Sequence, residues 1–142
     1  MRPDRIIVGE VRGAETVDMI QAFCTGSDGS LSTGHGNNIK DMLYRLETMV
    51  MMGMDVPALA VRRQLASGID LMIHLGRLRD KRRVILEIAE IEGCVDGEIK
   101  VNPLYRFAES DSREKGKVEG SWEKIGELHC KEKLFMAGIY DD

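Results

Sequence analysis

The sequence lacks a phosphate-binding loop: the pattern G-x-x-x-x-G-K-[ST] occurs nowhere in its 142 residues. Such a loop supplies the lysine and the backbone N–H groups that hold the phosphates of a nucleotide. No other residue of this chain replaces that lysine and that cradle of N–H groups. We therefore expect any nucleotide site formed by this sequence to be half of a complete one.

Long apolar runs and an excess of basic charge are also absent. No stretch approaches the roughly 20 apolar residues that span a bilayer, and the charged N-terminus lacks a signal-peptide pattern. The net charge is −4, with 20 basic and 24 acidic residues. This balance gives no reason to expect nucleic acid or an anionic membrane as the main partner. We expect a soluble, cytoplasmic protein.

Cysteine is scarce, with three residues in the chain. Cys24, Cys94 and Cys130 are far apart and never form a C-x-x-C pattern. This spacing supports neither a disulfide framework nor a zinc site. We expect all three to be reduced residues that pack in the interior.

The first third of the chain predicts a parallel β-α-β unit. Residues 6–8 (IIV) form a short apolar run, typical of a strand that is buried on both faces. Residues 15–24 have a mostly helical pattern, and residues 29–33 are a second short strand. A strand, a helix and a strand within about thirty residues indicate a right-handed unit with parallel strands.

Two further helices follow this unit. Asn38 is suited to cap the first of them, and Gly53 to end it. Pro57 fits the first turn of the second, which runs to about Gly68. Methionines stand at positions 49, 51, 52 and 54. We interpret them as core or interface residues rather than as an adaptable binding surface.

From Ile69 onwards the apolar period changes to two, which indicates antiparallel strands. The elements predicted here are strands over 69–76, 84–88 and 98–107, turns at 80–81 and 96–97, a mobile loop over 109–120 and a helix over 128–137. The predicted fold class is α/β. It is a single domain over residues 1–142, in which a parallel β-α-β unit is extended by antiparallel strands and a C-terminal helix.

Glu10 follows the first apolar run at the carboxyl end of its strand, where open α/β sheets place their ligand groups. An ATPase presents a catalytic acid in this way, to orient the attacking water or to hold Mg²⁺ through water. The alternative is a strand-end glutamate that faces solvent or pairs with Arg12. The spacing alone does not decide between these two interpretations.

Thr33 and His35 follow the second predicted strand, within the Gly-flanked polar segment TGSDGSLSTGHGN (residues 25–37). Because the carboxyl ends of parallel strands share one edge of a sheet, we expect both residues to lie beside Glu10. There the imidazole and the hydroxyl could each donate a hydrogen bond to a terminal phosphate. The alternative for His35 is a solvated or capping histidine.

These segments together resemble a known family. The segment RPDRIIVGEVRGAE (residues 2–15), followed by SLST (30–33) and His35, is similar to the Walker B and histidine-box region of type II and type IV secretion ATPases. The resemblance is closest to the CpaF/TadA-like branch that drives tight-adherence pili. The downstream segments that agree are RLETMV (45–50), QLASGID (64–70), RLRD (77–80), RRV (82–84), NPLYRF (102–107) and KLFMAGI (133–139).

The resemblance implies the C-terminal half of a RecA-like P-loop NTPase domain in a hexameric motor. Glu10 then matches the Walker B acid, His35 the residue that senses the γ-phosphate, and Arg12 the arginine that follows the acid. Thr33 falls among the nucleotide-binding residues.

The same resemblance implies ATP and Mg²⁺ as cofactors, with Glu10 holding the metal through water. It implies inner-membrane platform proteins as partners, a position at the inner face of the membrane, and no activity for the isolated chain. Two positions depart from the family pattern: Ser27 stands where histidine is usual, and Gly34 where a larger apolar residue is usual.

Two other functions are compatible with the sequence. The chain could be a non-catalytic docking module for a ring ATPase, with an exposed apolar flank where a P-loop strand and helix would pack. It could also be a metal hydrolase that uses Glu10, Asp28 and His35, although no clustered ligand spacing supports this. A basic cluster is either a solvated hairpin tip or a contact to a neighbouring subunit; its members are Arg77, Arg79, Lys81, Arg82 and Arg83.

Overall fold

The structure is a computed structural model that describes residues 5–25, 29–110 and 118–139. In chain order the elements are β1 (Ile7–Val8), α1 (Thr16–Cys24), β2 (Leu31–Ser32), α2 (Ile39–Gly53), α3 (Ala58–Gly68), β3 (Leu71–Arg77), β4 (Arg83–Val95), β5 (Glu98–Glu109), β6 (Gly120–Lys124) and α4 (Glu132–Met136). The predicted mixture of a parallel unit and antiparallel strands is confirmed.

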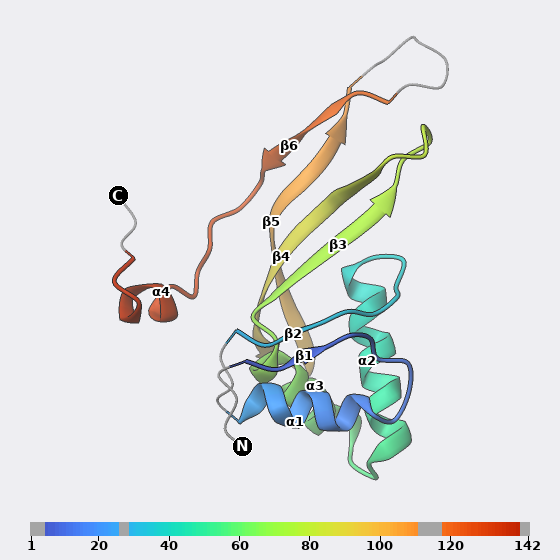
Figure 1. The fold of residues 1–142 in the computed structure, drawn as a ribbon. Coiled ribbons are helices and arrows are strands. Elements are labelled where there is room, and N and C mark those ends of the chain that lie inside the picture. Colours follow the sequence, from blue (N-terminus) through green and yellow to red (C-terminus); the bar gives the residue numbers. More distant parts are fainter. Residues whose placement is uncertain (1–4, 26–28, 111–117, 140–142) are drawn as a thin grey trace.

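Strands β1 and β2 form a two-stranded parallel sheet, in which Ile7 pairs with Leu31 and Val8 with Ser32. Helix α1 connects them and is drawn below the pair in Figure 1. The predicted parallel β-α-β unit is therefore present, and it brings the ends of β1 and β2 to the same edge.

Helix α2 begins at the predicted cap. The backbone of Asn38 is extended, and its side chain accepts a hydrogen bond from the backbone N–H of Asp41 at 2.7 Å. This bond satisfies one of the amide groups that have no partner within the first turn of a helix. The cap thus fixes the start of α2 at Ile39, four residues after His35.

The hydrophobic core lies between helices α1, α2 and α3 and one end of the antiparallel sheet. Its fully buried members include Ile20, Val50, Val61 and Leu65. Val61 and Leu65 are four residues apart on α3 and thus share the face that the core covers. The remaining buried residues of the cluster are Val11, Met19, Ile39, Leu43, Leu46, Ile69, Ala89 and Ile91.

The methionines after residue 48 divide between core and surface. Met49 and Met54 pack against the core, as predicted. Met51 and Met52 are exposed, so the core prediction is wrong for them. The reason is the helical period: the next two residues after buried Val50 turn away from the core by about 100° each.

The second sheet is antiparallel, with the strand order β3-β4-β5-β6, and it extends away from the helices (Figure 1). Strand β4 has 13 residues and continues well beyond the predicted strand over 84–88. Its register with β5 shifts after Ile88 and again after Ile91. These irregularities interrupt the apolar alternation, which is why the second half of β4 was not predicted.

Strand β6 has no counterpart in the sequence prediction, since Trp122 is its only apolar residue. Trp122 pairs with Phe107 of β5 across the sheet, and the two rings make an edge contact with their centroids 5.4 Å apart. The indole N–H also donates to the backbone carbonyl of Ile85 at 2.7 Å. Contacts with distant residues therefore hold β6 in place.

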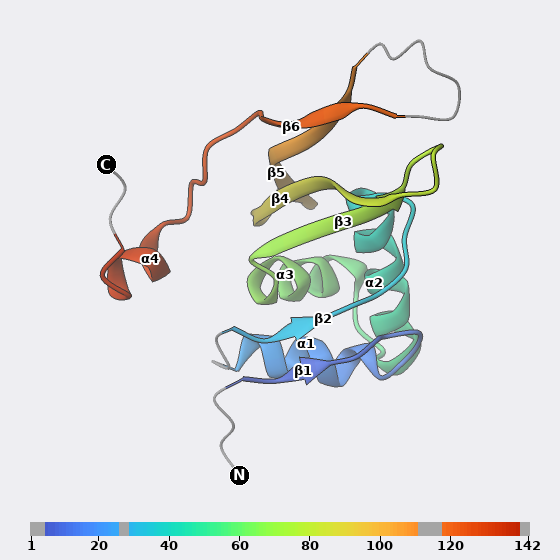
Figure 2. The ribbon, with the colours of Figure 1, turned by 45° about the horizontal axis from the view of Figure 1, so that its top comes forward.

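The loop prediction over 109–120 falls mainly outside the described residues. At its margins it is wrong, because Glu109 belongs to β5 and Gly120 to β6, while Val118 is buried. The C-terminal helix, predicted over 128–137, is limited to α4. Figures 1 and 2 show α4 standing apart from the helical body at the end of a connecting segment.

Apolar side chains are exposed on strands that have an unpaired side in the described part of the chain. Ile7 and Leu31, which are direct partners in the parallel sheet, are both exposed, as are Leu71, Ile73 and Leu75 along β3. Strand β3 is an edge strand without a charged side chain between Leu71 and Gly76. Such an edge is a template for pairing with another strand. Apolar side chains are therefore exposed on both sheets.

The cysteines are free thiols, as predicted, but their packing differs from the prediction. Cys24 and Cys130 are exposed and Cys94 is half-buried. Partial burial of the thiol raises the pKa of Cys24.

Within the described ranges, no helix has the length and apolar character needed to cross a membrane.

Candidate active site at the ends of the parallel strands

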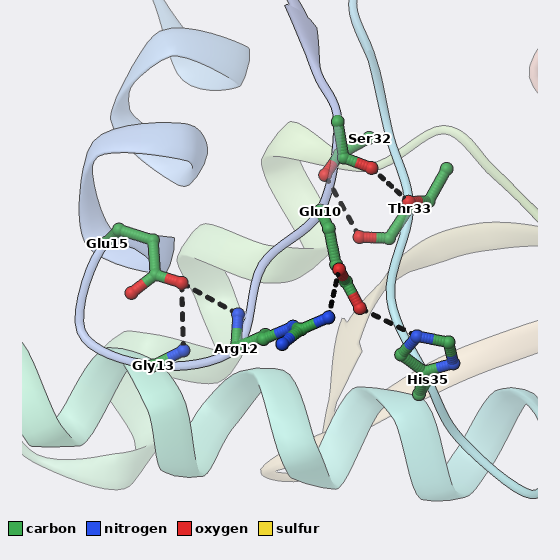
Figure 3. Close-up of polar contacts among 8 residues, drawn as sticks. Glu10, Arg12, Gly13, Glu15, Ser32, Thr33 and His35 are labelled. Carbon is green, nitrogen blue, oxygen red and sulfur yellow. Dashed lines mark hydrogen bonds and ion pairs between the residues drawn. The ribbon is translucent and has the colours of Figure 1, made fainter.

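Glu10 lies just beyond the end of β1, and its side chain is 28% exposed. Oε1 of Glu10 lies 2.6 Å from Nε2 of His35, and Oε2 accepts a hydrogen bond from Nη2 of Arg12 at 2.8 Å (Figure 3). The carboxylate is therefore held between two basic side chains. The sequence left open whether Glu10 is a catalytic acid or a strand-end residue that faces solvent or pairs with Arg12. The structure has the pair with Arg12 together with a contact to His35.

Backbone contacts hold the two strand ends together beyond the short sheet. The backbone N–H of Val11 donates to the carbonyl of Thr33 at 3.1 Å, and the hydroxyl of Thr33 donates to the carbonyl of Gly9. These bonds flank Glu10 and carry the segment of His35 alongside it (Figure 3). The predicted proximity of Glu10, Thr33 and His35 is thus confirmed, although the Thr33 hydroxyl donates to the backbone.

Glu15 organises the turn between β1 and α1, a role that the sequence analysis missed. Its carboxylate accepts hydrogen bonds from the backbone N–H groups of Arg12 at 2.7 Å and Gly13 at 3.1 Å (Figure 3). The bond from the Arg12 N–H in particular lowers the pKa of Glu15. The available signal was an acidic residue immediately before a helix, where negative charge is favoured.

The electrostatics keep Glu10 ionised. The hydrogen bond and the positive charge of Arg12 lower its pKa, with a further contribution from His35, and these effects exceed the opposing effect of burial. The pKa of Arg12 is raised by the same contact with Glu10. An ionised carboxylate can accept a proton from water or hold a cation through water.

The two basic partners of Glu10 are accessible. The side chains of Arg12 and His35 are 78% and 82% exposed, whereas that of Glu10 is mostly shielded. Both bases can therefore reorient towards an incoming anion without repacking the core. The residues present thus fit a phosphate-bearing ligand, with a shielded carboxylate between two exposed basic side chains that can donate hydrogen bonds.

Met42 explains how the chain tolerates glycine at position 34. A Cβ atom added to Gly34 would lie 2.3 Å from Cε of Met42 and 3.3 Å from its sulfur. The thioether of Met42 thus takes the space into which a larger residue at position 34 would project. The other departure, Ser27, and the alternative metal ligand Asp28 lie outside the described residues.

Acidic side chains pair with two of the basic residues at the hairpin turn between β3 and β4. Nη2 of Arg79 pairs with Glu109 at 3.0 Å, and Nε of Arg82 pairs with Asp80 at 2.7 Å. Burial alone would raise the pKa of Asp80, but hydrogen bonds from Arg82 and from the Val118 N–H lower it. These contacts give two of the five basic residues a structural role at the turn.

Comparison with known proteins identifies relatives of the chain. The family model described as type II/IV secretion system protein matches residues 1–136. A Mycobacterium tuberculosis protein named for conjugal transfer is 44% identical over 89 residues, which are 63% of this chain and 25% of that protein. Conjugal transfer protein TrbB of Rhizobium radiobacter is 34% identical over 93 residues, which are 66% of this chain and 28% of that protein.

A solved structure agrees with these relatives. The crystal structure of the VirB11 ATPase from the Brucella suis type IV secretion system, in complex with sulphate, matches with a TM-score of 0.60 and 30% identity. The match covers 63% of this chain and 28% of that one. The chain therefore spans about a quarter of the length of these relatives.

Proposed function

This chain belongs to the type II/IV secretion system protein family, and we propose that it forms the catalytic-carboxylate half of an ATP-hydrolysing motor domain. The phosphate-binding loop is absent from the sequence, so the complete site needs a second half that carries such a loop. On this proposal the isolated chain does not turn over ATP.

The observation that carries the proposal is the position of Glu10. Its ionised carboxylate lies at the carboxyl end of a parallel strand, 2.6 Å from a histidine that comes from the end of the neighbouring strand. Glu10 accepts the proton of the water that attacks the terminal phosphate, or orients that water. Mg²⁺, which Glu10 would hold through water, supplies charge neutralisation when it is bound.

Arg12, Thr33 and His35 serve the nucleotide in this proposal. The side chains of Arg12 and His35 that contact Glu10 are exposed, and such surface contacts contribute little to stability. A triphosphate carries more negative charge than one carboxylate and competes for both basic side chains. When the nucleotide binds, the His35 side chain moves from Glu10 to the terminal phosphate, which frees one carboxylate oxygen of Glu10. Thr33 continues to join the two strand ends.

The wider assembly is also part of the proposal. We assign the chain to a hexameric ring at the inner face of the membrane that acts with inner-membrane platform proteins. The motifs RLETMV (45–50) and NPLYRF (102–107) favour a tight-adherence pilus motor. The relatives named for conjugal transfer and type IV secretion support the broader class of export motors.

ATP turnover after reconstitution tests the proposal. This chain is joined to the P-loop-bearing half of a close relative, and phosphate release is measured for the wild type and for Glu10→Gln. We expect turnover in the wild type and a loss of about 10²-fold to 10⁴-fold in Glu10→Gln, the range typical of a removed general base. Equal turnover in both would refute the role of Glu10.

A docking module without catalysis is the second candidate, and the exposed edge of β3 favours it. A P-loop-bearing partner that adds a strand there would cover Leu71, Ile73 and Leu75. Sizing by light scattering, with and without that partner half, tests this function. A chain that stays monomeric and has no affinity for the partner would exclude it, and a folded complex that lacks turnover would favour it over the ATPase.

A further inference from the structure

A second polar cluster lies away from Glu10, where the segment before α4 crosses strand β4. It is formed by Glu90 and Glu92 of β4 and by His129 of the connecting segment. One carboxylate oxygen of each glutamate and a ring nitrogen of His129 all lie within 4.8 Å of one another. The three residues are 37 to 39 positions apart in sequence across the two segments, so the fold alone assembles them.

Glu90 is the buried member of the cluster, with 2% of its surface exposed. Its Oε1 accepts hydrogen bonds from the backbone N–H of His129 at 2.9 Å and from Nδ2 of Asn102 at 3.1 Å, and its Oε2 accepts one from the N–H of Cys130 at 2.8 Å. A carboxylate oxygen has two lone pairs. These bonds occupy both lone pairs of Oε1 and leave one on Oε2.

The remaining lone pair of Oε2 is suited to bind a cation, because Glu90 is buried and lies beside Glu92 and His129.

Glu92 has an incompletely satisfied carboxylate. Its side chain is 12% exposed, and Oε1 contacts Nδ1 of His129. Oε2 is shielded from solvent and accepts no hydrogen bond from the described residues, although Nζ of Lys100 lies 3.3 Å away. A shielded charge without hydrogen bonds is costly.

We propose that Glu90, Glu92 and His129 bind a divalent transition metal ion, with Zn²⁺ as the preferred ion. One imidazole nitrogen and two carboxylates are a donor set that suits Zn²⁺, and the nitrogen disfavours Ca²⁺ and Mg²⁺, which take oxygen ligands. The bound ion satisfies the shielded oxygen of Glu92. The ion also links the segment before α4 to β4, and this structural role does not depend on any ATPase activity.

Metal titration of the tag-free 142-residue chain tests the site, with Co²⁺ as a spectroscopic substitute for Zn²⁺. We expect one equivalent of Co²⁺ to bind with visible d–d absorption, and Zn²⁺ to displace it. His129→Gln and Glu92→Gln each replace a proposed ligand, so each should weaken binding by more than the roughly 10-fold to 100-fold that loss of an outer-shell partner costs. His129→Gln keeps the backbone N–H that donates a hydrogen bond to Glu90, so this bond remains in the variant.

Two controls make the result decisive. His74→Gln, on strand β3, replaces a histidine outside the cluster and should bind Co²⁺ like the wild type. Hydrogen exchange of the wild type with and without Zn²⁺ should slow in peptides that contain residues 88–93 and 127–131. Absence of saturable binding, equal affinity in all variants, or slowing confined to other segments would each overturn the proposal.

Discussion

Nε2 of His35 and Oε1 of Glu10 lie 2.6 Å apart, although the two residues follow different strands. The parallel register of β1 and β2 creates this contact, since it brings both carboxyl ends to one edge. Arg12 holds the other carboxylate oxygen. The pKa of Glu10 therefore depends on two side chains that can be replaced one at a time.

Replacing Arg12 with glutamine should raise the pKa of the Glu10 carboxyl towards its ordinary value of about 4.3. The reason is that the hydrogen bond and the charge of Arg12 are the main causes of its lowering. Carbon-detected NMR titration of the isolated chain measures the pKa. His35→Gln should raise it less, and Arg79→Gln, at the distant hairpin tip, should leave it unchanged. A larger effect from His35→Gln than from Arg12→Gln would contradict this order.

Gly34 and Met42 should be energetically coupled, because a side chain at position 34 would overlap the thioether of Met42. Gly34→Leu alone should destabilise the chain by about 1–3 kcal/mol through overpacking. In the double variant Gly34→Leu with Met42→Ala, part of that loss should be recovered. Urea denaturation of the four proteins completes the cycle, and a coupling below about 0.5 kcal/mol would mean that Met42 does not take the place of a larger residue at 34.

Asn38→Ala should lower the free energy of unfolding by about 1 kcal/mol, because it removes the side-chain cap of α2. Asn37→Ala is the matched control: the contact of Asn37 with Asp41 uses its backbone N–H, which alanine retains. Thermal denaturation of both variants measures the difference. Similar losses in both would mean that the Asn38 side chain does not stabilise the helix start.

The sequence was sufficient where the determinants are local or follow from topology. The Asn38 cap acts over three residues, and the meeting of Glu10 with His35 follows from two apolar strands joined by a helix. Local patterns did not reveal β6, because its stability comes from the contact of Trp122 with Phe107 in another strand. Periodicity was also misleading for Met52, which lies on the exposed side of α2.

The polar cluster at Glu90 could not be predicted from the sequence. Its carboxylate accepts hydrogen bonds from backbone N–H groups 39 and 40 residues away. A backbone donor does not depend on the residue type, so the sequence does not reveal it. Glu90 itself looks like one of several acidic residues in an alternating strand. Only the path of the chain after β6, which brings His129 and Cys130 to Glu90, reveals that this glutamate is buried and hydrogen-bonded.

Glu90→Gln should lower the free energy of unfolding at neutral pH by about 2 kcal/mol, since it removes hydrogen bonds to a charged acceptor. An amide also offers one acceptor oxygen, so its NH₂ group must face an N–H of His129 or Cys130. The segment before α4 should therefore detach more readily. Its amides, measured by hydrogen exchange, should lose protection while those of α3 keep theirs.

The pH dependence of this difference follows from the lowered pKa of Glu90. A carboxyl whose folded pKa is depressed contributes its full stability above the unfolded pKa of about 4.3, and that contribution is lost as the pH falls through the folded pKa. The stability gap between wild type and Glu90→Gln should thus be constant near neutrality and shrink in acid. Urea denaturation of both proteins between about pH 3 and 7 spans this range. A gap that is independent of pH would show that the charge of Glu90 does not hold the segment.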